Sequence, residues 1–413
     1  MTAQLVVMNT GGIALASDSA VTIHGKKVYH SANKLIHLAE NHTIGVMIYG
    51  SSSLFHVPWE TLIKVYRNTL TEPLDSVKNY LEGFIHFLHH NPYKEFLDEI
   101  NEERYIENTL YRRVQDLYRD LSAINNNLYS EYGELHLQDE IQEIYAEQAA
   151  IFLDEQARHL SDKAYPLGFN EHDEEILMEK YEDKICSLLT KQFDNHLLQV
   201  EWTPVLTQLM IQSILKDFSN NYSGIVFAGY GDKEIYPSAY VMIIDGKVNN
   251  KTKYFTRKKI INYTTHGSIL PFAQRDMMRS FLDGIHEEME DFLSTFLQRE
   301  LHHVKETFLH QIKDYLREDM SMDVIDKEIS HTISQFYQHY QNEVATHKRK
   351  HFIDPILDIV DSLPASELAH LSESLLNVTS LKRKMSIEME TVGGPIDVAI
   401  ITKGDGFKWV KKK

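Results

Sequence analysis

Cysteine is almost absent from this sequence, and long hydrophobic runs are missing altogether. The one cysteine, Cys186, excludes an internal disulfide framework and any metal site built from several thiolates, which fits a reducing compartment. No run of about 18 apolar residues is present that could span a membrane. The opening stretch, MTAQLVVMNTGG, has neither the basic start nor the long apolar centre of a signal peptide. We therefore expect a cytoplasmic protein.

Positive charge is also scarce. The formal net charge is −18, and residues 131–200 hold 17 Asp or Glu against 5 Lys or Arg, a difference of −12. The basic clusters HKRKH and KWVKKK are short. Because binding to a nucleic-acid backbone or an anionic lipid surface requires clustered positive charge, we expect neither nucleic acid nor a membrane as a partner.

The hydrophobic pattern divides the chain into strand-rich ends and helical blocks. A hydrophobic content of 43% is enough for a sizeable core. Alternation and turn signals predict a strand meander over residues 3–50, strands over 224–248 and a terminal hairpin formed by PIDVAIIT and FKWV. Helical spacing dominates from about residue 52 to 216 and again from about 270 to 388. Strands that enclose helices predict an α+β domain enlarged by helical insertions.

Three residues near the start of the chain have the chemistry of a catalytic site. Removal of the initiator methionine is expected before a small residue and would leave Thr2 with a hydroxyl and a free α-amine. This pair can act as nucleophile and base, because an α-amine titrates near pH 8. Asp18 follows 16 residues later within the mostly apolar GGIALASDSAVTI, and Lys34 lies 16 residues after Asp18.

The segments TAQLVVMNTGGIALASDSAVT and SANKLIHLAENHTIGVMIYGSSS resemble the proteasome β-subunit and the HslV-type peptidases, which are N-terminal-nucleophile hydrolases. The resemblance implies a four-layer αββα sandwich. It also implies that Thr2 is the nucleophile and that Asp18 is buried to hold Lys34. The ammonium of Lys34 would then favour the neutral form of the nearby Thr2 amine.

Further segments extend the resemblance to about half of the chain. YGSSSLF implies that the backbone N–H of Gly50 helps to form an oxyanion hole. HGSILPFAQ is similar to a Gly-Ser turn before the third helix of the family, which implies that the hydroxyl of Ser268 lies near the Thr2 amine. GIVFAGYG with YVMIIDGKV resembles a hairpin of the second sheet. One departure is that Met389 and Val392 stand where β-subunits carry an Asp and a Ser.

The same resemblance divides the chain into a core and two insertions. The core is expected to comprise residues 1–70, 217–284 and 363–413, with an acidic helical insertion over 71–216 and a second one over 285–362. Family members assemble as rings, and long amphipathic helices must bury an apolar face. We therefore expect a homo-oligomer built partly through the insertions, with an ATPase or another regulator as a further possible partner.

The function expected from these residues is that of a threonine-type peptidase or amide hydrolase acting on peptides or unfolded proteins. Two alternatives stay open: hydrolysis of a small-molecule amide on the same fold, and an inactive scaffold or sensor. Asp18 could also simply cap a turn, with Lys34 as a solvated edge residue. We expect no cofactor or metal, because with 22 histidines the spacing in LEGFIHFLHH and LHHVKETFLH can arise by coincidence.

Overall fold

The computed structural model describes most of the chain, namely residues 3–23, 27–29, 32–90, 98–132, 138–193, 199–219, 221–313, 321–386 and 393–413. Thr2, Met389 and Val392, which the sequence singled out, lie outside the described residues.

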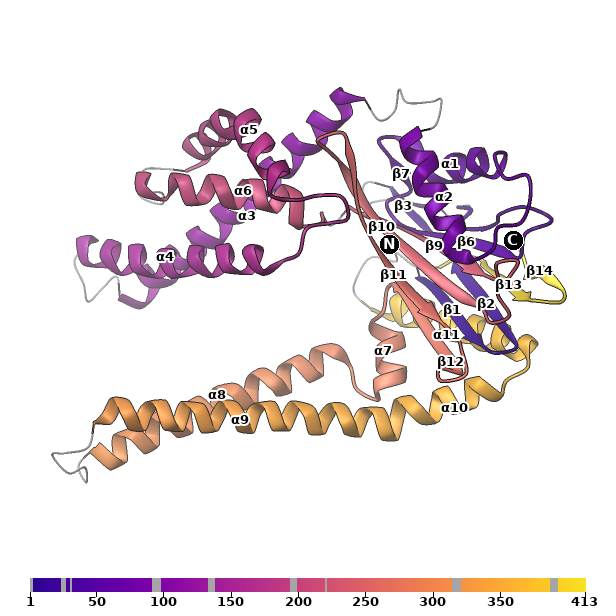
Figure 1. The fold of residues 1–413 in the computed structure, drawn as a ribbon. Coiled ribbons are helices and arrows are strands. Elements are labelled where there is room, and N and C mark those ends of the chain that lie inside the picture. The colour runs from indigo at the N-terminus through magenta and orange to yellow at the C-terminus, as the bar shows by residue number, and fades with distance from the viewer. Residues whose placement is uncertain are drawn as a thin grey trace.

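Two five-stranded antiparallel sheets form the centre of the fold (Figure 1). The first sheet has the order β12 (Gly267–Ala273), β1 (Ala3–Asn9), β2 (Gly12–Asp18), β13 (Ile396–Thr402) and β14 (Gly406–Lys411). The second has the order β11 (Lys251–Ile260), β10 (Ser238–Val248), β9 (Ser223–Gly229), β6 (Ile44–Gly50) and β5 (Leu35–His37). Two short hairpins are formed by β3 (Val21–Ile23) with β4 (Lys27–Tyr29) and by β7 (Ser53–Leu54) with β8 (Val57–Pro58).

Helices cover the outer face of each sheet. Alternate residues such as Val6, Leu15 and Met47 pack between the sheets, because successive strand side chains point to opposite faces. The outer face of the first sheet is covered by α7 (Asp276–Asp283), α10 (Asp354–Ser362) and α11 (Ala365–Met385). The outer face of the second is covered by α1 (Trp59–Arg67) and α2 (Val77–His90). The fold is a four-layer αββα sandwich, as the sequence predicted.

The first helical insertion has an apolar core of its own. It consists of α3 (Glu99–Tyr132), α4 (Gln138–Asp162), α5 (Glu171–Gln192), the 3₁₀ turn Val200–Trp202 and α6 (Thr203–Lys216). Buried residues recur at helical spacing, as in Leu110, Val114, Leu117 and Leu121 of α3. Val248, at the end of β10, packs into the same core.

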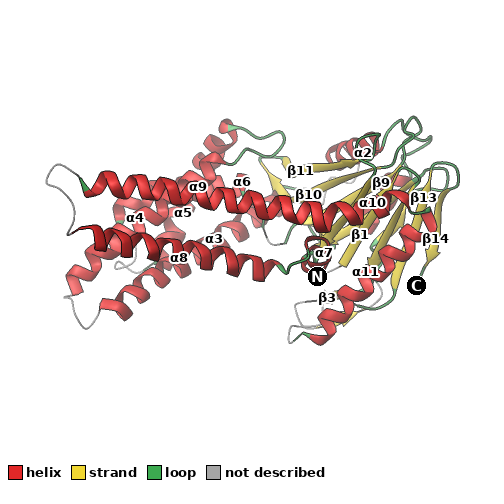
Figure 2. Ribbon diagram, turned by 90° about the horizontal axis from the view of Figure 1, so that it is seen from below, coloured by secondary structure: helices red, strands yellow, loops and turns green. Residues whose placement is uncertain are grey.

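The second insertion is a helical hairpin that extends away from the sandwich (Figures 1 and 2). Its helices are α8 (Glu287–Ile312) and α9 (Met322–Lys348), and the π-helical turn Arg349–Ile353 continues α9 into α10. Lys305 and Asp326 form an ion pair of 2.7 Å between α8 and α9. A second helix-to-helix pair, Lys348 with Glu290, measures 2.6 Å.

The structure corrects three expectations about the elements. Residues 3–50 do not form one meander, since β1 and β2 belong to the first sheet and β5 and β6 to the second. Helix α2 lies within the predicted insertion 71–216 but packs on the second sheet, so that the insertion begins after it. Likewise α10, at the end of the predicted insertion 285–362, packs on the first sheet with residues such as Val360.

A buried polar cluster joins the first insertion to the second sheet. Asp245 lies at a β-bulge in β10 and accepts hydrogen bonds from the hydroxyls of Tyr105 and Ser219, each at 2.5 Å. The ammonium of Lys253 lies 3.3 Å from Asp245 and donates to the carbonyl of Ile214 at 2.7 Å. Burial lowers the pKa of Lys253, and the attraction of Asp245 opposes this shift. Helices α3 and α6 are thus fastened to the β10–β11 hairpin through one charged pair.

Replacing Lys253 should destabilise the contact between the first insertion and the second sheet. We expect Lys253→Met to lower the free energy of unfolding by about 3 to 5 kcal/mol, because Asp245 is left as a buried carboxylate without its cation. Urea unfolding followed by circular dichroism measures the change. Lys258→Met, at an exposed position of the same strand, is the matched control and should change stability by less than about 0.5 kcal/mol. Equal stability of the two variants would contradict the structural role of Lys253.

Candidate functional site

The structure brings Asp18 and Lys34 into direct contact between the two sheets. Asp18 ends β2 in the first sheet, and Lys34 precedes β5 in the second. The lysine nitrogen lies 2.8 Å from the Asp18 Oδ1, and the two side chains are 7% and 2% exposed, respectively. Lys34 is therefore not a solvated edge residue, and Asp18 is more than a turn cap.

The carboxylate of Asp18 also binds two backbone N–H groups. The N–H of Ala3 donates to Oδ1 at 3.1 Å, and that of Gly393 donates to Oδ2 at 3.3 Å. Lys34 donates a second hydrogen bond to the carbonyl of Ala20. Both charged groups thus have several partners, as buried charges require. The cluster gathers the start of β1, the end of β2 and the segment before β13 at one place.

Burial shifts the titration of both members of the pair. Loss of hydration raises the pKa of Asp18, while the charge and hydrogen bond of Lys34 oppose this shift. Burial lowers the pKa of Lys34, with the attraction of Asp18 again opposing it. Each charge therefore depends on the other, and removal of either leaves its partner in an unfavourable environment.

Gly50 is the last residue of β6, and this end of the strand lies close to Lys34. Its φ is +76°, and a Cβ there would lie 2.3 Å from the carbonyl oxygen of Tyr222, so that only glycine fits without strain. The N–H of Ile48 donates to the carbonyl of Lys34 at 2.9 Å, whereas that of Ser51 donates to Tyr222 of the β9 side at 2.9 Å. Because strand N–H groups alternate in direction, the N–H of Gly50 points with that of Ile48, away from β9.

The structure does not bring Ser268 to this cluster. Ser268 pairs with Met8, whereas Ala3 pairs with Ala273 at the other end of β12. Five residues of strand separate the two positions, a distance of roughly 17 Å. The expected placement of Ser268 was wrong because GSILPFA is a strand with Ile269 and Phe272 buried, and the helix begins only at Asp276.

Gln4 is a neighbour of the cluster that the sequence analysis missed. Its side-chain nitrogen donates to the carbonyl of Ile48 at 2.6 Å and to the hydroxyl of Ser17 at 3.0 Å, which links the two sheets. Its side-chain oxygen is buried and has no hydrogen-bond partner among the described residues. A lone amide within AQLVVM was a signal of the same kind as Asp18, a polar residue in an apolar strand.

The histidine-rich helices do not form a metal centre within the part of the chain that the structure describes. No group of three or more His, Cys, Asp or Glu side chains there is placed to hold an ion. His86 and His90 stack at 4.1 Å between ring centres, and His302 lies 4.0 Å from Glu306. Among the described residues, no helix combines the length and the hydropathy that crossing a bilayer requires.

Comparisons with known proteins give matches among solved structures but none among family models or curated proteins. No protein-family model matches this chain, and no curated protein matches it either. Among solved structures, a Gly-1 mutant of Anbu from Hyphomicrobium sp. strain MC1 is similar with 10% identity and a TM-score of 0.29, covering 100% of this chain and 86% of that one. Anbu from the same strain is similar with 9% identity and a TM-score of 0.28, covering 99% and 86%.

These comparisons correct the family suggested by the sequence. The assignment to proteasome β-subunits and HslV-type peptidases was wrong, because no model of any family matches and the similar solved structures are Anbu chains. Their TM-scores are too low to carry an argument about the site. The fold class follows from the strand order and layers described above, and the chemistry has to follow from the residues.

The contribution of Lys34 to stability should depend on pH. We expect Lys34→Met to lower the free energy of unfolding by about 3 to 5 kcal/mol at pH 7, because the buried Asp18 loses its cation. Without Lys34, burial raises the pKa of Asp18 still further above 3.8. A group with a raised pKa in the folded state stabilises the fold at low pH and loses this effect as the pH rises. The deficit of the variant should therefore shrink between pH 7 and pH 4.

Urea titrations at pH 7, 5.5 and 4 measure this dependence. Lys64→Met is the matched control, since Lys64 forms an exposed ion pair with Glu60 on α1 and should matter little at any of these pH values. A deficit that stays constant from pH 7 to 4 would argue against a charged, buried Asp18.

Proposed function

We propose that this protein is a threonine-type amide hydrolase in which Thr2, exposed by removal of Met1, is the nucleophile. The observation that supports it is the hydrogen bond of 3.1 Å from the N–H of Ala3 to the buried Asp18, which also holds Lys34. Ala3 is the residue bonded to Thr2, and consecutive Cα atoms lie about 3.8 Å apart. The ion pair therefore lies beside Ala3, the chain neighbour of the residue that combines a hydroxyl with an α-amine.

In the proposed reaction the Thr2 hydroxyl attacks the carbonyl carbon of an amide. The Thr2 α-amine accepts the hydroxyl proton and returns it to the leaving amine, and water then hydrolyses the ester. The backbone N–H of Gly50 is our candidate donor to the oxyanion of the tetrahedral intermediate. The ammonium of Lys34 keeps the neighbouring amine neutral through like-charge repulsion, and Asp18 holds Lys34 in place.

Replacement of the nucleophile should abolish hydrolysis without altering the fold. We expect Thr2→Ala to lose at least about 10³-fold in turnover, since both the hydroxyl attack and the covalent intermediate disappear. Thr2→Ser should keep part of the activity. Release of amine from a panel of fluorogenic peptides and small-molecule amides measures turnover and also shows which class of amide is cleaved.

The control is Thr10→Ala, at an exposed turn between β1 and β2, which should leave turnover unchanged. Mass spectrometry of each preparation shows whether Met1 has been removed. If processed wild-type protein and Thr2→Ala cleave a substrate equally fast, Thr2 is not the nucleophile. If processed wild-type protein cleaves none of the panel, the chain is a scaffold or sensor.

We also propose that the protein is a homo-oligomer that associates through α8. Met289, Phe292, Leu293 and Phe296 are exposed, with fractions between 42% and 61%. Their spacing of i, i+3, i+4 and i+7 puts them on one face of the helix. Exposed aromatic side chains on one face are typical of an interaction surface, and a second copy would bury them.

Negative charge on this face of α8 should prevent association between copies of the chain. We expect Phe292→Glu with Phe296→Glu to convert an oligomer into a monomer, because two carboxylates would have to be buried in the contact. Light scattering at micromolar concentration gives the mass of both proteins. Thr295→Glu, exposed on the same helix but outside this face, is the control. A monomeric wild type, or an oligomer that survives the double substitution, would disprove the contact.

A further inference from the structure

A cavity of about 250 Å³ lies beside Gly50, between the sandwich and the first insertion. The loop that follows β6 contributes Ser51 and Ser53 to its wall, and α3 contributes Arg104, Asn108 and Arg112. Its volume is several times the share of about 30 Å³ that one water molecule takes in the liquid. The cavity can thus hold a side chain of a molecule whose reacting bond lies near Gly50.

The wall that α3 supplies is one face of that helix. The residues that line the cavity are Asn101, Arg104, Tyr105, Asn108 and Arg112, with spacings of i, i+3, i+4, i+7 and i+11. Tyr105 donates its hydroxyl to Asp245 at 2.5 Å, which fixes this face against the bulge of β10. The guanidinium groups are therefore presented from a rigid element.

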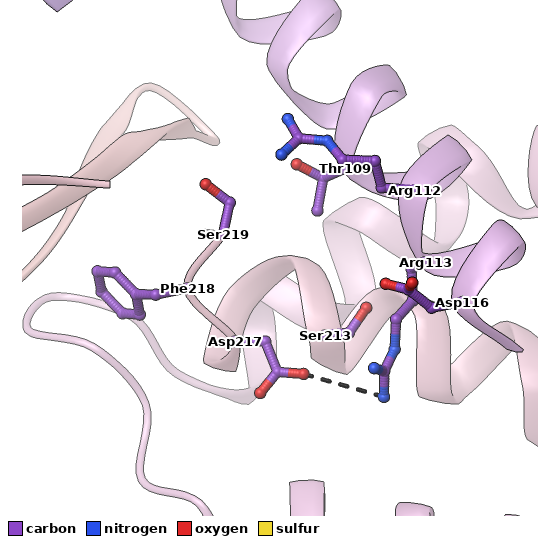
Figure 3. Close-up of a pocket in the computed structure, with 8 residues that line it drawn as sticks. All are labelled: Thr109, Arg112, Arg113, Asp116, Ser213, Asp217, Phe218 and Ser219. Carbon is purple, nitrogen blue, oxygen red and sulfur yellow. Dashed lines mark ion pairs between the residues drawn. The ribbon is translucent and has the colours of Figure 1, made fainter. Parts of the chain in front are cut away.

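Among the residues that the structure describes, two arginines of this wall have no acidic partner. Arg104 and Arg112 are exposed, and no ion pair of either one exists within the described ranges of the chain. The neighbouring Arg113 points to Asp217 at 4.0 Å, whereas Arg112 extends away from that pair beside Thr109 (Figure 3). The carboxylate of Asp245 also reaches the cavity, but Lys253 balances its charge.

We infer that this cavity is a recognition subsite for an acidic side chain of a peptide substrate, held by Arg104 and Arg112. The inference rests on the proposed function, since the cavity gains this role only if the amide is cleaved near Gly50. A guanidinium presents a planar fork of N–H donors that matches the two oxygens of a carboxylate. Asn108, on the same face of α3, can donate a further hydrogen bond.

Binding and cleavage are tested separately. The probes are octapeptides with one glutamate placed at each position in turn, each with a glutamine counterpart, and their affinity for the Thr2→Ala protein is measured by fluorescence anisotropy. We expect one register in which the glutamate peptide binds about tenfold more tightly, with an advantage that falls as salt rises. Arg104→Gln and Arg112→Gln should each remove most of this advantage. Arg119→Gln should keep it, because Arg119 lies about two turns beyond Arg112 on α3 and does not line the cavity.

The two proposals can fail independently. If the glutamate peptide binds as expected but the wild-type protein does not cleave it, hydrolysis is excluded and the acidic subsite stands as a binding site. If the wild-type protein cleaves glutamate and glutamine peptides with equal KM in every register, the subsite is excluded and hydrolysis stands. Arg104→Glu should reverse the preference toward lysine peptides, and an unchanged preference in this variant would also overturn the inference.

Discussion

The ion pair between Asp18 and Lys34 is the contact on which the arrangement of the site depends. A carboxylate at the end of a buried strand is unfavourable unless a cation and hydrogen-bond donors accompany it. Lys34 comes from the other sheet, and the N–H groups of Ala3 and Gly393 come from the start of β1 and from the segment before β13. Satisfying one buried charge therefore fixes four separate stretches of backbone, and the start of β1 is one of them.

A second buried pair of the same type fixes the first insertion. The bulge in β10 turns Asp245 toward α3, where Tyr105 and Lys253 meet it. Long helical insertions are usually free to vary in orientation, but this one is fastened by charges that cannot be exposed or separated cheaply. Helix α3 is consequently held beside the Gly50 end of β6, and its side chains form part of the wall of the cavity there.

The four-layer sandwich and the contact of Asp18 with Lys34 were predicted through the resemblance to N-terminal-nucleophile hydrolases. The residues alone indicated an α+β domain and an acidic residue in an apolar strand, which needs a partner if it is buried. The sequence was not sufficient for Ser268, since GSILPFA reads as a turn or a strand with equal ease, and only pairing with β1 decides. Nor could it separate α2 from the insertion, because both have helical periodicity and differ only in what they pack against. The bulge at Asp245 depends on strand register, which local pattern does not encode.

The arginine side chains in the wall of the cavity contrast with the negative charge of the rest of the molecule. The chain has a net charge of −18, and basic side chains near α3 are engaged with acidic ones, as Lys184 is with Glu107 and Lys180 with Glu103. Such an excess of negative charge repels anionic ligands at long range. Attraction can prevail only at short distance, within about 8 Å of a cationic group at physiological salt. For an acidic protein to bind acidic peptides, as we propose, it therefore needs cations such as Arg104 and Arg112 at the site itself.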